Sequence, residues 1–444
     1  MGDIHGGLLA MELKEIAGEL QLQGVGGKFM RECGVAMMQG QVSTDVVSSI
    51  GLVEALPHLL RGMKAMKQAR RYIKQEMPSV IVMIDYPGFN LPLLKWIRRK
   101  RLQGRFSGSK VVYYIPPNEW LFLEGSASSV CSLSNLVLSV YPDEFEHYRK
   151  SAAKGMKDGV VADENGQTKV QYVGHPLVDY VDRSKMSKSQ AREIIRREQS
   201  TSSSSPQSRK SPAVIINEDS LVIALLPASR KQELSLVLPI MLEACSILAD
   251  TLQQQQQQQR ERCESDVVFV VSVAREEFAE AIHEESLRLK LDNRVVLFGG
   301  SSHVAIQAAD VCISKSGSCS LEVGLLNVPQ VVVYKVGKAT AFVLRRILRF
   351  KLKYVSLVNL ILGRMSVPEL IQKEAVPEKI SKEVANLLSV QQQPASTTAG
   401  LAGKKKLSRK GLEQLESYQE LRAMLGSGGA VRRAAERVLA ILGT

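Results

Sequence analysis

The chain lacks the patterns that mark several common classes of protein. Its six cysteines form no C-x-x-C pair and its six histidines form no H-x-x-x-H pair, so we expect reduced thiols and no metal site. No apolar run approaches the ~20 residues that a membrane-spanning helix needs, and neither a signal peptide nor a clear transit peptide opens the sequence. These absences argue against a disulfide-framed domain, a zinc protein and an integral membrane protein.

Aromatic residues are also scarce, at 5% of the chain, and no RNP, KH or zinc-finger pattern is present. We therefore expect no nucleic-acid partner, because a surface that stacks bases needs aromatic side chains in an ordered array. Lys and Arg nevertheless outnumber Asp and Glu by 58 to 45, which gives a net charge of +13. This excess favours other anionic partners, namely a phospholipid surface or phosphorylated small molecules.

Short β-branched runs alternate with helical stretches along most of the 444 residues. The clearest strand-like runs are Val80–Ile84, Val111–Ile115, Leu136–Val140, Val222–Leu226, Val267–Val273, Arg294–Phe298 and Val331–Tyr334. This alternation predicts a doubly wound α/β fold, and the length predicts two or three domains. We place one Rossmann-like domain near residues 1–180, a second near 181–345 and a helical region over 346–444. A ligand is expected in a cleft between the two α/β domains.

Three segments have a strongly biased composition. Ser200–Pro212 is rich in serine, Gln253–Gln259 is a run of glutamines, and Gln391–Lys410 ends in a basic cluster. Such compositions bury too little apolar surface to support a core. We expect all three to be disordered surface insertions without chemistry, the last of them extending to about residue 411.

A buried strand, a tight turn and a helix follow one another in Leu225–Leu234 (LLPASRKQEL). Ser229 is placed to cap the helix, which leaves backbone N–H groups available for a phosphate, and Arg230 adds a forked cationic donor. The alternative is an ordinary turn whose arginine is solvated, and this pattern alone does not separate the two.

A second turn of this kind lies in Ser314–Glu322 (SKSGSCSLE), after another strand-like run. Its small residues let a ligand approach the backbone, and Ser318 or Ser320 can cap the helix that follows. Glu322 lies one turn inside, where its carboxylate could accept both hydroxyls of a ribose; the alternative is a capping box, which many α/β proteins contain. Two such turns in one domain suit a nucleotide diphosphate.

In the first half, Asp85 follows an apolar strand within Met83–Asn90 (MIDYPGFN). Parallel sheets place working residues at this carboxyl end, so the aspartate could act as a general base with a pKa raised by partial burial. The alternative, which the local sequence favours, is a turn aspartate that bonds the backbone ahead of Pro87.

Cations gather on three amphipathic stretches, Arg61–Lys74, Trp96–Arg101 and Phe342–Lys353. Helices of this composition can lie on an anionic membrane. The same composition fits core helices with a solvated basic face, and both interpretations stay open.

Taken in chain order, the segments above and several others form a longer pattern. Its pieces are GDIHGGLLAMELK, GVGGKFMRECG, IGLVEALPHLL, IDYPGFNL, YYIPPNEW, YVGHPLVDYV, LLPASR, SKSGSCSLE, VPQVVVYKV and YVSLVNLILGRMSVPELIQ. Together, and nearly from end to end, they resemble lipid A disaccharide synthase, a family of inverting glycosyltransferases with the two-domain GT-B architecture.

The resemblance implies that a 2,3-diacylglucosamine is transferred from UDP to the 6-hydroxyl of 2,3-diacylglucosamine 1-phosphate. The products would be the β-1,6 lipid A disaccharide precursor and UDP, with no cofactor or metal. The partners would be the two acylated sugars and an anionic membrane surface, with a homo-oligomer left open. We expect a peripheral membrane protein, in the mitochondrion or plastid of a eukaryote or else on the cytoplasmic face of an inner membrane.

The family pattern also assigns residues. Asp85 would be the base that takes the proton of the acceptor hydroxyl, and Arg230 would stabilise the departing diphosphate. The donor and its nucleotide would lie against Ser229, Ser316, Gly317, Ser318, Glu322, Asn359, Arg364 and Gln372. Asn359 is also a catalytic candidate, and His175 would either contact the donor or fix the hinge.

The chain departs from the family in the half where the acceptor would bind. Gly2–Asp3 lacks the preceding strand and the Gly-Glu-Ser triplet, Gly88 replaces a second aspartate, and Phe122 replaces a second tryptophan. These departures indicate either an incomplete N-terminus or a loss of activity. The alternatives to the transferase are therefore a degenerate nucleotide- or lipid-binding homologue and another GT-B enzyme that uses UDP-GlcNAc.

Overall fold

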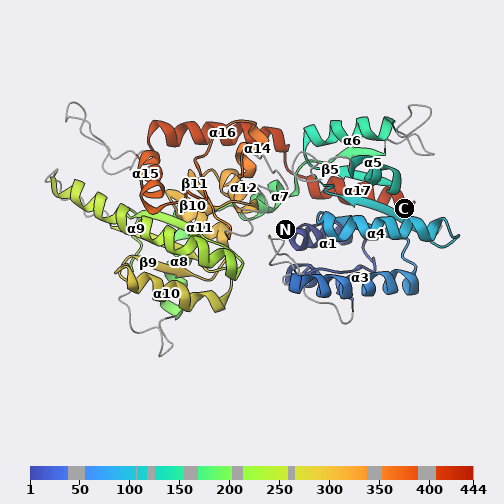
Figure 1. The fold of residues 1–444 in the computed structure, drawn as a ribbon, viewed down its shortest axis with the longest axis horizontal. Helices are drawn as coiled ribbons and strands as arrows, with labels where there is room; N and C mark the ends of the chain where they lie inside the picture. The colour runs from blue at the N-terminus through green and yellow to red at the C-terminus, as the bar shows by residue number, and fades with distance from the viewer. Residues whose placement is uncertain are drawn as a thin grey trace. The chain divides into compact units, whose positions relative to one another are not determined.

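The computed structural model describes residues 1–38, 56–106, 108–117, 126–154, 169–202, 214–258, 266–337, 353–388 and 407–443. The chain divides into two compact units (Figure 1). Unit 1 contains Met1–Asp182 and Ala423–Thr444, and unit 2 contains Arg183–Arg422. Each unit has its own parallel sheet and its own hydrophobic core.

Unit 1 is built around a four-stranded parallel sheet in the order β3-β4-β5-β6. Its strands are β3 (Val80–Ile84), β4 (Lys110–Tyr114), β5 (Leu136–Ser139) and β6 (Val170–Tyr172), and a short parallel pair is formed by β1 (Gln23–Gly24) and β2 (Ala36–Met37). The helices are α1 (Gly2–Ala17), α2 (Lys28–Glu32), α3 (Leu56–Glu76), α4 (Pro87–Arg101), α5 (Ser126–Leu133), α6 (Pro142–Lys154), α7 (Pro176–Arg183), which ends one residue past the boundary, and α17 (Ala430–Leu442).

Strand β4 shows why this sheet is covered on both faces. Val111 and Tyr113 belong to the core that α3, α4, α5 and α6 complete, and neighbouring residues of a strand point to opposite faces. Val112 and Tyr114 therefore point to the other face, where α1 and α17 pack together and contact the sheet. All four side chains are fully buried. An uninterrupted apolar run is what a central parallel strand requires.

The start of α1 is tied to the segment that follows it through Asp3. The Asp3 carboxylate accepts hydrogen bonds from the N–H groups of Gly27 at 2.6 Å, Phe29 at 3.0 Å and Met30 at 3.1 Å, at the N-terminus of α2. A negative charge is favourable there, because the first N–H groups of a helix lack partners inside it. Asp3 of the N-terminal motif therefore stabilises the start of α2 and connects it to α1.

Unit 2 contains a six-stranded parallel sheet in the order β12-β11-β10-β7-β8-β9. Its strands are β7 (Leu221–Leu226), β8 (Val267–Ser272), β9 (Val295–Phe298), β10 (Val311–Lys315), β11 (Gln330–Tyr334) and β12 (Glu369–Ile371). The helices are α8 (Lys188–Ser202), α9 (Lys231–Gln258), the 3₁₀ turn η3 (Glu276–Phe278), α10 (Ala279–Arg288), α11 (Ser302–Ala308), α12 (Ser318–Leu325), α14 (Leu357–Leu362), α15 (Pro377–Leu387) and α16 (Arg409–Leu425), whose last three residues belong to unit 1.

The order of strands in unit 2 reverses between β7 and β10. From β7 the chain builds outward through β8 to β9, and it then returns to add β10, β11 and β12 on the other side of β7. In open parallel sheets, ligands bind beyond the carboxyl ends of the strands at such a switch point. We therefore expect unit 2 to bind its ligand at the loops that follow β7 and β10.

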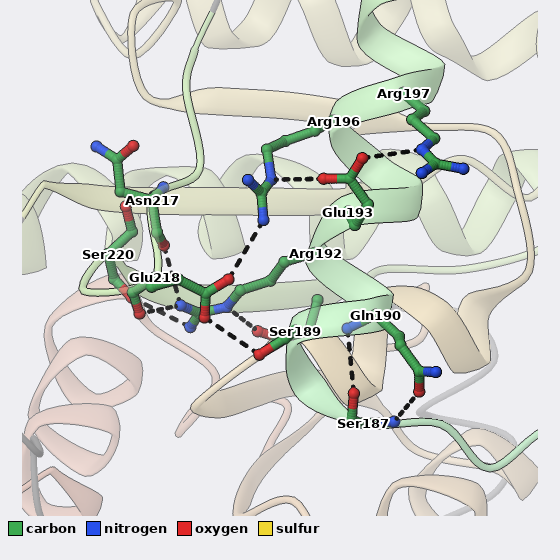
Figure 2. A network of polar contacts seen from close by, with 11 residues as sticks. Ser187, Ser189, Gln190, Arg192, Glu193, Arg196, Arg197, Asn217, Glu218 and Ser220 are labelled. Atoms are coloured by element: carbon green, nitrogen blue, oxygen red, sulfur yellow. Dashed lines mark hydrogen bonds and ion pairs between the residues drawn. The ribbon is translucent and has the colours of Figure 1, made fainter.

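A buried arginine on α8 fastens the opposite, amino-terminal end of this sheet (Figure 2). The Arg192 guanidinium donates to the carbonyls of Asn217, Glu218 and Ser220, in the segment before β7. It also donates to the carbonyl of Ala308, and one of its nitrogens lies 3.2 Å from the carboxylate of Asp310. Only 2% of Arg192 is exposed, and Asp310 in turn accepts the N–H of Val222 at 2.9 Å. A single side chain thus connects α8 with the residues that lead into β7 and β10.

Two expectations change in the structure. The glutamine run, expected to be disordered, continues α9 as far as Gln258, because glutamine is a good helix former and the helix is already anchored by core contacts upstream. The expected helical region over 346–444 is divided between the units and contributes strand β12 to unit 2. Phe342–Lys353 lies outside the described residues except for Lys353, as do most of Ser200–Pro212 and of Gln391–Lys410.

Among the described residues, one helix is long and apolar enough to cross a membrane by length and composition alone, namely α9 over Lys231–Gln254. Half of that stretch is buried inside the protein, where it packs against α15 and contributes to the core of unit 2.

Candidate active site

Two loops of unit 2 are neighbours because they follow paired strands at the switch point. Residues 227–230 connect β7 to α9, residues 316–317 connect β10 to α12, and β7 and β10 pair in parallel. Arg230 Nη1 lies 3.3 Å from Glu233 Oε1, while Lys315 Nζ donates to Glu233 Oε2 at 2.9 Å. Glu233 therefore joins the two loops, and two cations face one carboxylate. The remaining positive charge suits an anionic ligand.

The start of α9 differs by one residue from the prediction. The helix begins at Lys231, and the carbonyl of Arg230 accepts the N–H of Leu234 at 2.9 Å, which makes Arg230 the N-cap. The expectation that Ser229 caps the helix is therefore wrong. The carboxylate of Glu233 supplies the negative charge that stabilises a first helical turn, and Ser229 lies exposed in the loop before it.

Gly317 is the N-cap of α12, and its φ of 140° lies in a region that residues with a side chain rarely adopt. A Cβ added there would meet nothing within 4 Å, so the backbone borders open space. Ser316 is buried and donates to the carbonyl of Val355 at 2.6 Å, which fixes the loop. Ser318 opens the helix and is half-buried.

The expected caps of α12 are not formed. The Ser320 hydroxyl donates to the carbonyl of Gly317 at 2.7 Å instead of accepting a helix N–H, and the N-cap has no side-chain hydrogen bond. A glycine at this position leaves the first N–H groups uncovered by a side chain. This arrangement is the one that helix N-termini use to hold phosphate.

Glu322 lies one turn inside α12 and is almost entirely buried. Its Oε2 is 3.0 Å from Nε2 of His303 on α11, and the other ring nitrogen of His303 is 2.6 Å from the hydroxyl of Ser184. His303 therefore holds one oxygen of the Glu322 carboxylate, the group that we expect to bind the ribose hydroxyls.

Asn359 shapes the segment that leads into β12. Its Nδ2 donates to the carbonyl of Val367 and to the carboxylate of Glu369, and its Oδ1 accepts the N–H groups of Ser366 and Val367. Both amide protons and both lone pairs are thus used, and the side chain is fully buried. The geometry gives Asn359 a positioning task in this structure, and its predicted catalytic role stays a prediction.

Arg364 and Gln372 lie apart from this buried segment. Arg364 is half exposed and forms a paired contact with the carboxylate of Glu420 on α16. Gln372 follows β12 with a φ of 53°, and its N–H donates to the carbonyl of Tyr334 at the end of β11. Gln372 thus lies at the carboxyl edge of the sheet, on the side where the switch-point loops are.

Asp85 follows β3 at the carboxyl edge of the sheet in unit 1. Its φ of 51° is unusual for a residue with a side chain, and its N–H donates to the carbonyl of Tyr114. Its own carbonyl accepts hydrogen bonds from Asn90 Nδ2 at 2.7 Å and from the Tyr113 hydroxyl at 3.2 Å. Burial raises the pKa of Asp85, partly opposed by a hydrogen bond from the N–H of Tyr86. The bond from Tyr86 is one that a turn aspartate makes, whereas a raised pKa is what a general base needs, so the role of Asp85 as the base stays a prediction.

His175 is buried in unit 1 near the carboxyl end of β5. Its Nδ1 accepts the N–H of Leu177 at 3.1 Å, so the ring is neutral with its proton on Nε2, which lies 3.1 Å from the Tyr141 hydroxyl. Burial lowers the pKa of His175 to about 3. The rings of His175 and His5 meet edge to face at 6.1 Å. These contacts fix the backbone around residues 173–177, and the two expected roles of His175, donor contact or hinge, stay predictions.

Sequence reasoning missed three residues of the unit 2 site: Glu233, Lys315 and His303. Lys315 has a visible signal, because it is the last residue of a strand and directly precedes the small residues of the second loop. The contact of Glu233 with Lys315 and the contacts of His303 carry no such signal, since these partners are not local in the sequence. Among the described residues, no group of three His, Cys, Asp or Glu side chains is placed to hold a metal ion.

Two α/β units with parallel sheets, one of them carrying paired phosphate-type loops at its switch point, define the GT-B class of nucleotide-sugar enzymes. Solved structures of this class match nearly the whole chain. The structure described as S. aureus MnaA with UDP has 10% sequence identity and a TM-score of 0.55, over 100% of this chain and 94% of that chain. UDP-GlcNAc 2-epimerase from Neisseria meningitidis has 11% identity and a TM-score of 0.53, over 99% and 96%. The expected GT-B fold is confirmed.

The sequence comparisons go beyond the fold. The family model described as lipid-A-disaccharide synthetase matches residues 1–424. The lipid-A-disaccharide synthases of Gloeothece citriformis and Synechocystis are 31% and 30% identical to this chain, over 99% of it and over 96% and 94% of their own lengths. The chain belongs to the lipid-A-disaccharide synthetase family, as its motifs indicate, and it is a glycosyltransferase.

Proposed function

We propose that the chain transfers 2,3-diacylglucosamine from UDP to the 6-hydroxyl of 2,3-diacylglucosamine 1-phosphate, forming the β-1,6 lipid A disaccharide precursor. The observation that carries this proposal is the pair of loops after β7 and β10, joined by Glu233 and flanked by Arg230 and Lys315, in a chain of this family. A UDP-linked donor needs a diphosphate site of this kind. The two acylated sugars are the partners that the family motifs imply.

In this scheme the diphosphate of the donor lies against the N-terminus of α12 and the guanidinium of Arg230. As the bond between the anomeric carbon and the diphosphate oxygen breaks, negative charge develops on the departing UDP. The first N–H groups of α12, Arg230 and Lys315 stabilise that charge without rearrangement, because they are already held in place. Glu233 orients both cations, while Glu322 accepts the hydroxyls of the ribose.

Unit 1 supplies the acceptor chemistry through Asp85. Its carboxylate takes the proton of the acceptor 6-hydroxyl as that oxygen attacks the anomeric carbon on the face opposite UDP, which inverts the configuration. Burial raises the pKa of Asp85. A general base works most efficiently when its pKa lies near the operating pH, so this shift is in the favourable direction.

The product assay tests the proposal directly. The full chain is incubated with both acylated glucosamine substrates, and the product is examined by mass spectrometry; the expected product has the mass of the β-1,6 disaccharide phosphate. Arg230→Gln should weaken UDP binding by roughly tenfold or more, as expected for the loss of a charged hydrogen bond. The matched control is Arg288→Gln, which removes an arginine paired with Glu285 on the surface of α10. Equal UDP affinity in the two variants would reject the phosphate assignment.

We also propose that the protein associates peripherally with anionic membranes through α3 and α4. The apolar faces of both helices are used in the core, with Ile73 and Trp96 buried. Their exposed cations are Lys64, Lys67, Arg71, Lys74, Lys95, Arg98 and Arg99. Exposed Met63 and Leu102 accompany them. Each cation near an anionic surface contributes about 1 kcal/mol, so the set is sufficient for reversible binding.

Vesicle flotation tests this association. Full-length protein should float with vesicles that contain anionic lipid and stay behind with vesicles of neutral lipid. The double variant Arg98→Glu and Arg99→Glu should lower the bound fraction severalfold and leave UDP binding unchanged. Unaltered flotation of that variant would place the contact elsewhere.

A further inference from the structure

Three side chains of unit 2 are joined by hydrogen bonds near the loop of residues 316–317. Ser184 precedes α8, His303 is the second residue of α11, and Glu322 is on α12. The Ser184 hydroxyl lies 2.6 Å from His303 Nδ1, and His303 Nε2 lies 3.0 Å from Glu322 Oε2. The side chain of His303 is 2% exposed and that of Glu322 is 11% exposed.

The hydrogen bonds decide how the protons are arranged. A carboxylate oxygen accepts, so Nε2 of His303 carries a proton and donates it to Glu322. Nδ1 lies against the hydroxyl of Ser184, which can donate or accept. Partners on both sides therefore hold the imidazole in place, as in histidines that orient a functional group.

A glutamine one turn further along α11 keeps this chain in place. Gln307 Nε2 donates to the carbonyls of Ser184 and of His303, at 2.9 Å and 3.0 Å, and its Oε1 accepts the N–H of Met186 at 2.8 Å. Both the backbone that carries Ser184 and the helix that carries His303 are thus fixed. The position of the imidazole depends on the fold and not on the presence of a ligand.

The consequence falls on Glu322. A free glutamate side chain samples many rotamers, and ordering it on a ligand costs conformational entropy. Here Oε2 is already bound to His303, and 11% of the side chain is exposed, which leaves Oε1 as the oxygen to meet a ligand.

We propose that His303 is a positioning residue for nucleotide recognition: it holds the Glu322 carboxylate so that Oε1 accepts a ribose hydroxyl of the bound nucleotide. This inference rests on the nucleotide site of the proposed function. It adds a determinant of specificity, because a site built to accept a hydroxyl penalises a nucleotide that lacks it.

The competing explanation is that the histidine only stabilises the packing of α11 on α12. A structural role would weaken the binding of every nucleotide to a similar degree. A positioning role weakens only the binding of nucleotides that have ribose hydroxyls. The two explanations therefore differ in a ratio, the affinity for UDP divided by the affinity for 2′,3′-dideoxyuridine diphosphate.

The experiment measures both dissociation constants by calorimetry for the full chain and for three variants. The wild-type protein should bind UDP about tenfold more tightly than the dideoxy nucleotide. His303→Leu, which removes the donor, should bring the ratio close to one and leave the affinity for the dideoxy nucleotide unchanged. Glu322→Leu, which removes the acceptor, should have the same effect on the ratio. His303→Gln should restore most of it, because its amide can donate from nearly the place of Nε2.

Three outcomes would overturn the inference: a wild-type ratio near one, equal loss of both affinities in His303→Leu, or no recovery in His303→Gln when that variant unfolds at the wild-type temperature. The product assay is read separately. A wild-type protein that discriminates between the two nucleotides but forms no disaccharide would contradict the proposed reaction and support the role of His303. A wild-type protein that binds neither nucleotide would contradict both.

Discussion

Several residues that directly follow strands have a positive φ although they carry side chains. Asp85 follows β3, Ile115 follows β4 and Gln372 follows β12, with φ values of 51°, 59° and 53°. Such conformations cost roughly 1–3 kcal/mol each and persist only where the surrounding structure enforces them. At Asp85 the enforcement is visible, since its N–H and its carbonyl are both bound by the fold. Enforced backbone strain of this kind is frequent at functional sites, which supports a functional role for Asp85.

Asp85→Asn tests that role. The amide keeps the shape of the side chain but cannot take a proton, so turnover should fall by roughly 10²- to 10⁴-fold while UDP binding is unchanged. Because burial raises the pKa of Asp85, the wild-type rate should rise with pH across a value above the ordinary carboxylate range, as the base loses its proton. The variant should lack this rise. A pH–rate profile that keeps the same limb in the variant would remove Asp85 from the role of base.

His175 makes a prediction about stability. Its pKa is lowered from 6.5 to about 3 by burial, so between these values the unfolded chain binds a proton that the folded chain does not. Stability must then rise with pH across this window, by about 1.4 kcal/mol per pH unit from this residue. His5 acts in the same direction, because burial also lowers its pKa.

His175→Asn should keep the acceptor for the N–H of Leu177 and remove the titration. Urea unfolding of the variant at pH 6 and pH 5 should therefore show a smaller loss of stability on acidification than the wild type shows. His147→Asn, at an exposed position of α6 in the same unit, is the control and should leave the slope as it is. An unchanged acid dependence in His175→Asn would mean that another group controls it.

At the scale of elements, the outcome of the sequence analysis follows the range of the interactions. The strands and the loops after β7 and β10 could be predicted because their signals are local: apolar runs, then small residues, then a helix. The predicted serine caps of α9 and α12 are wrong, since Arg230 and Gly317 occupy the two N-cap positions. Contacts such as Ser184 with His303, 119 positions apart, have no local signal at all.

Arg192 gives the clearest example of contacts between residues far apart in the sequence. Arg192→Met should destabilise unit 2 by about 3–5 kcal/mol, because Asp310 loses a buried partner and four carbonyls lose their donor. Arg197→Met, on the same helix, is the matched control: its side chain is 78% exposed and pairs with Glu193, so the cost should stay within about 0.5 kcal/mol. Denaturant unfolding measures both variants. If both variants lost a similar amount of unfolding free energy, the buried contacts of Arg192 would not be what stabilises this end of the sheet.

At the scale of the whole chain, the assignment of the last residues to unit 1 is the property that sequence alone did not give. The family pattern runs nearly from end to end, yet the last residues return to unit 1, where α17 packs against α1 and β4. An apolar helix pattern predicts that α17 is amphipathic, but it does not say which sheet the helix covers. Asp85 in unit 1 and the loops after β7 and β10 in unit 2 lie at the carboxyl ends of strands, as the doubly wound fold predicts.

This division leads to a prediction for ligand binding in the intact protein. If the nucleotide is held by unit 2 alone, then UDP at 100 times its dissociation constant stabilises the conformations that bind it by about 2.7 kcal/mol. Amide hydrogen exchange of the full chain should then slow by up to ~100-fold in residues 227–234 and 316–322, because these segments cannot open locally while UDP is bound to them. Peptides of β3 and β4 should exchange at the same rate with and without UDP. Arg230→Gln at the same UDP concentration should lose most of the protection, whereas protection confined to the loop after β3 would assign the nucleotide to unit 1.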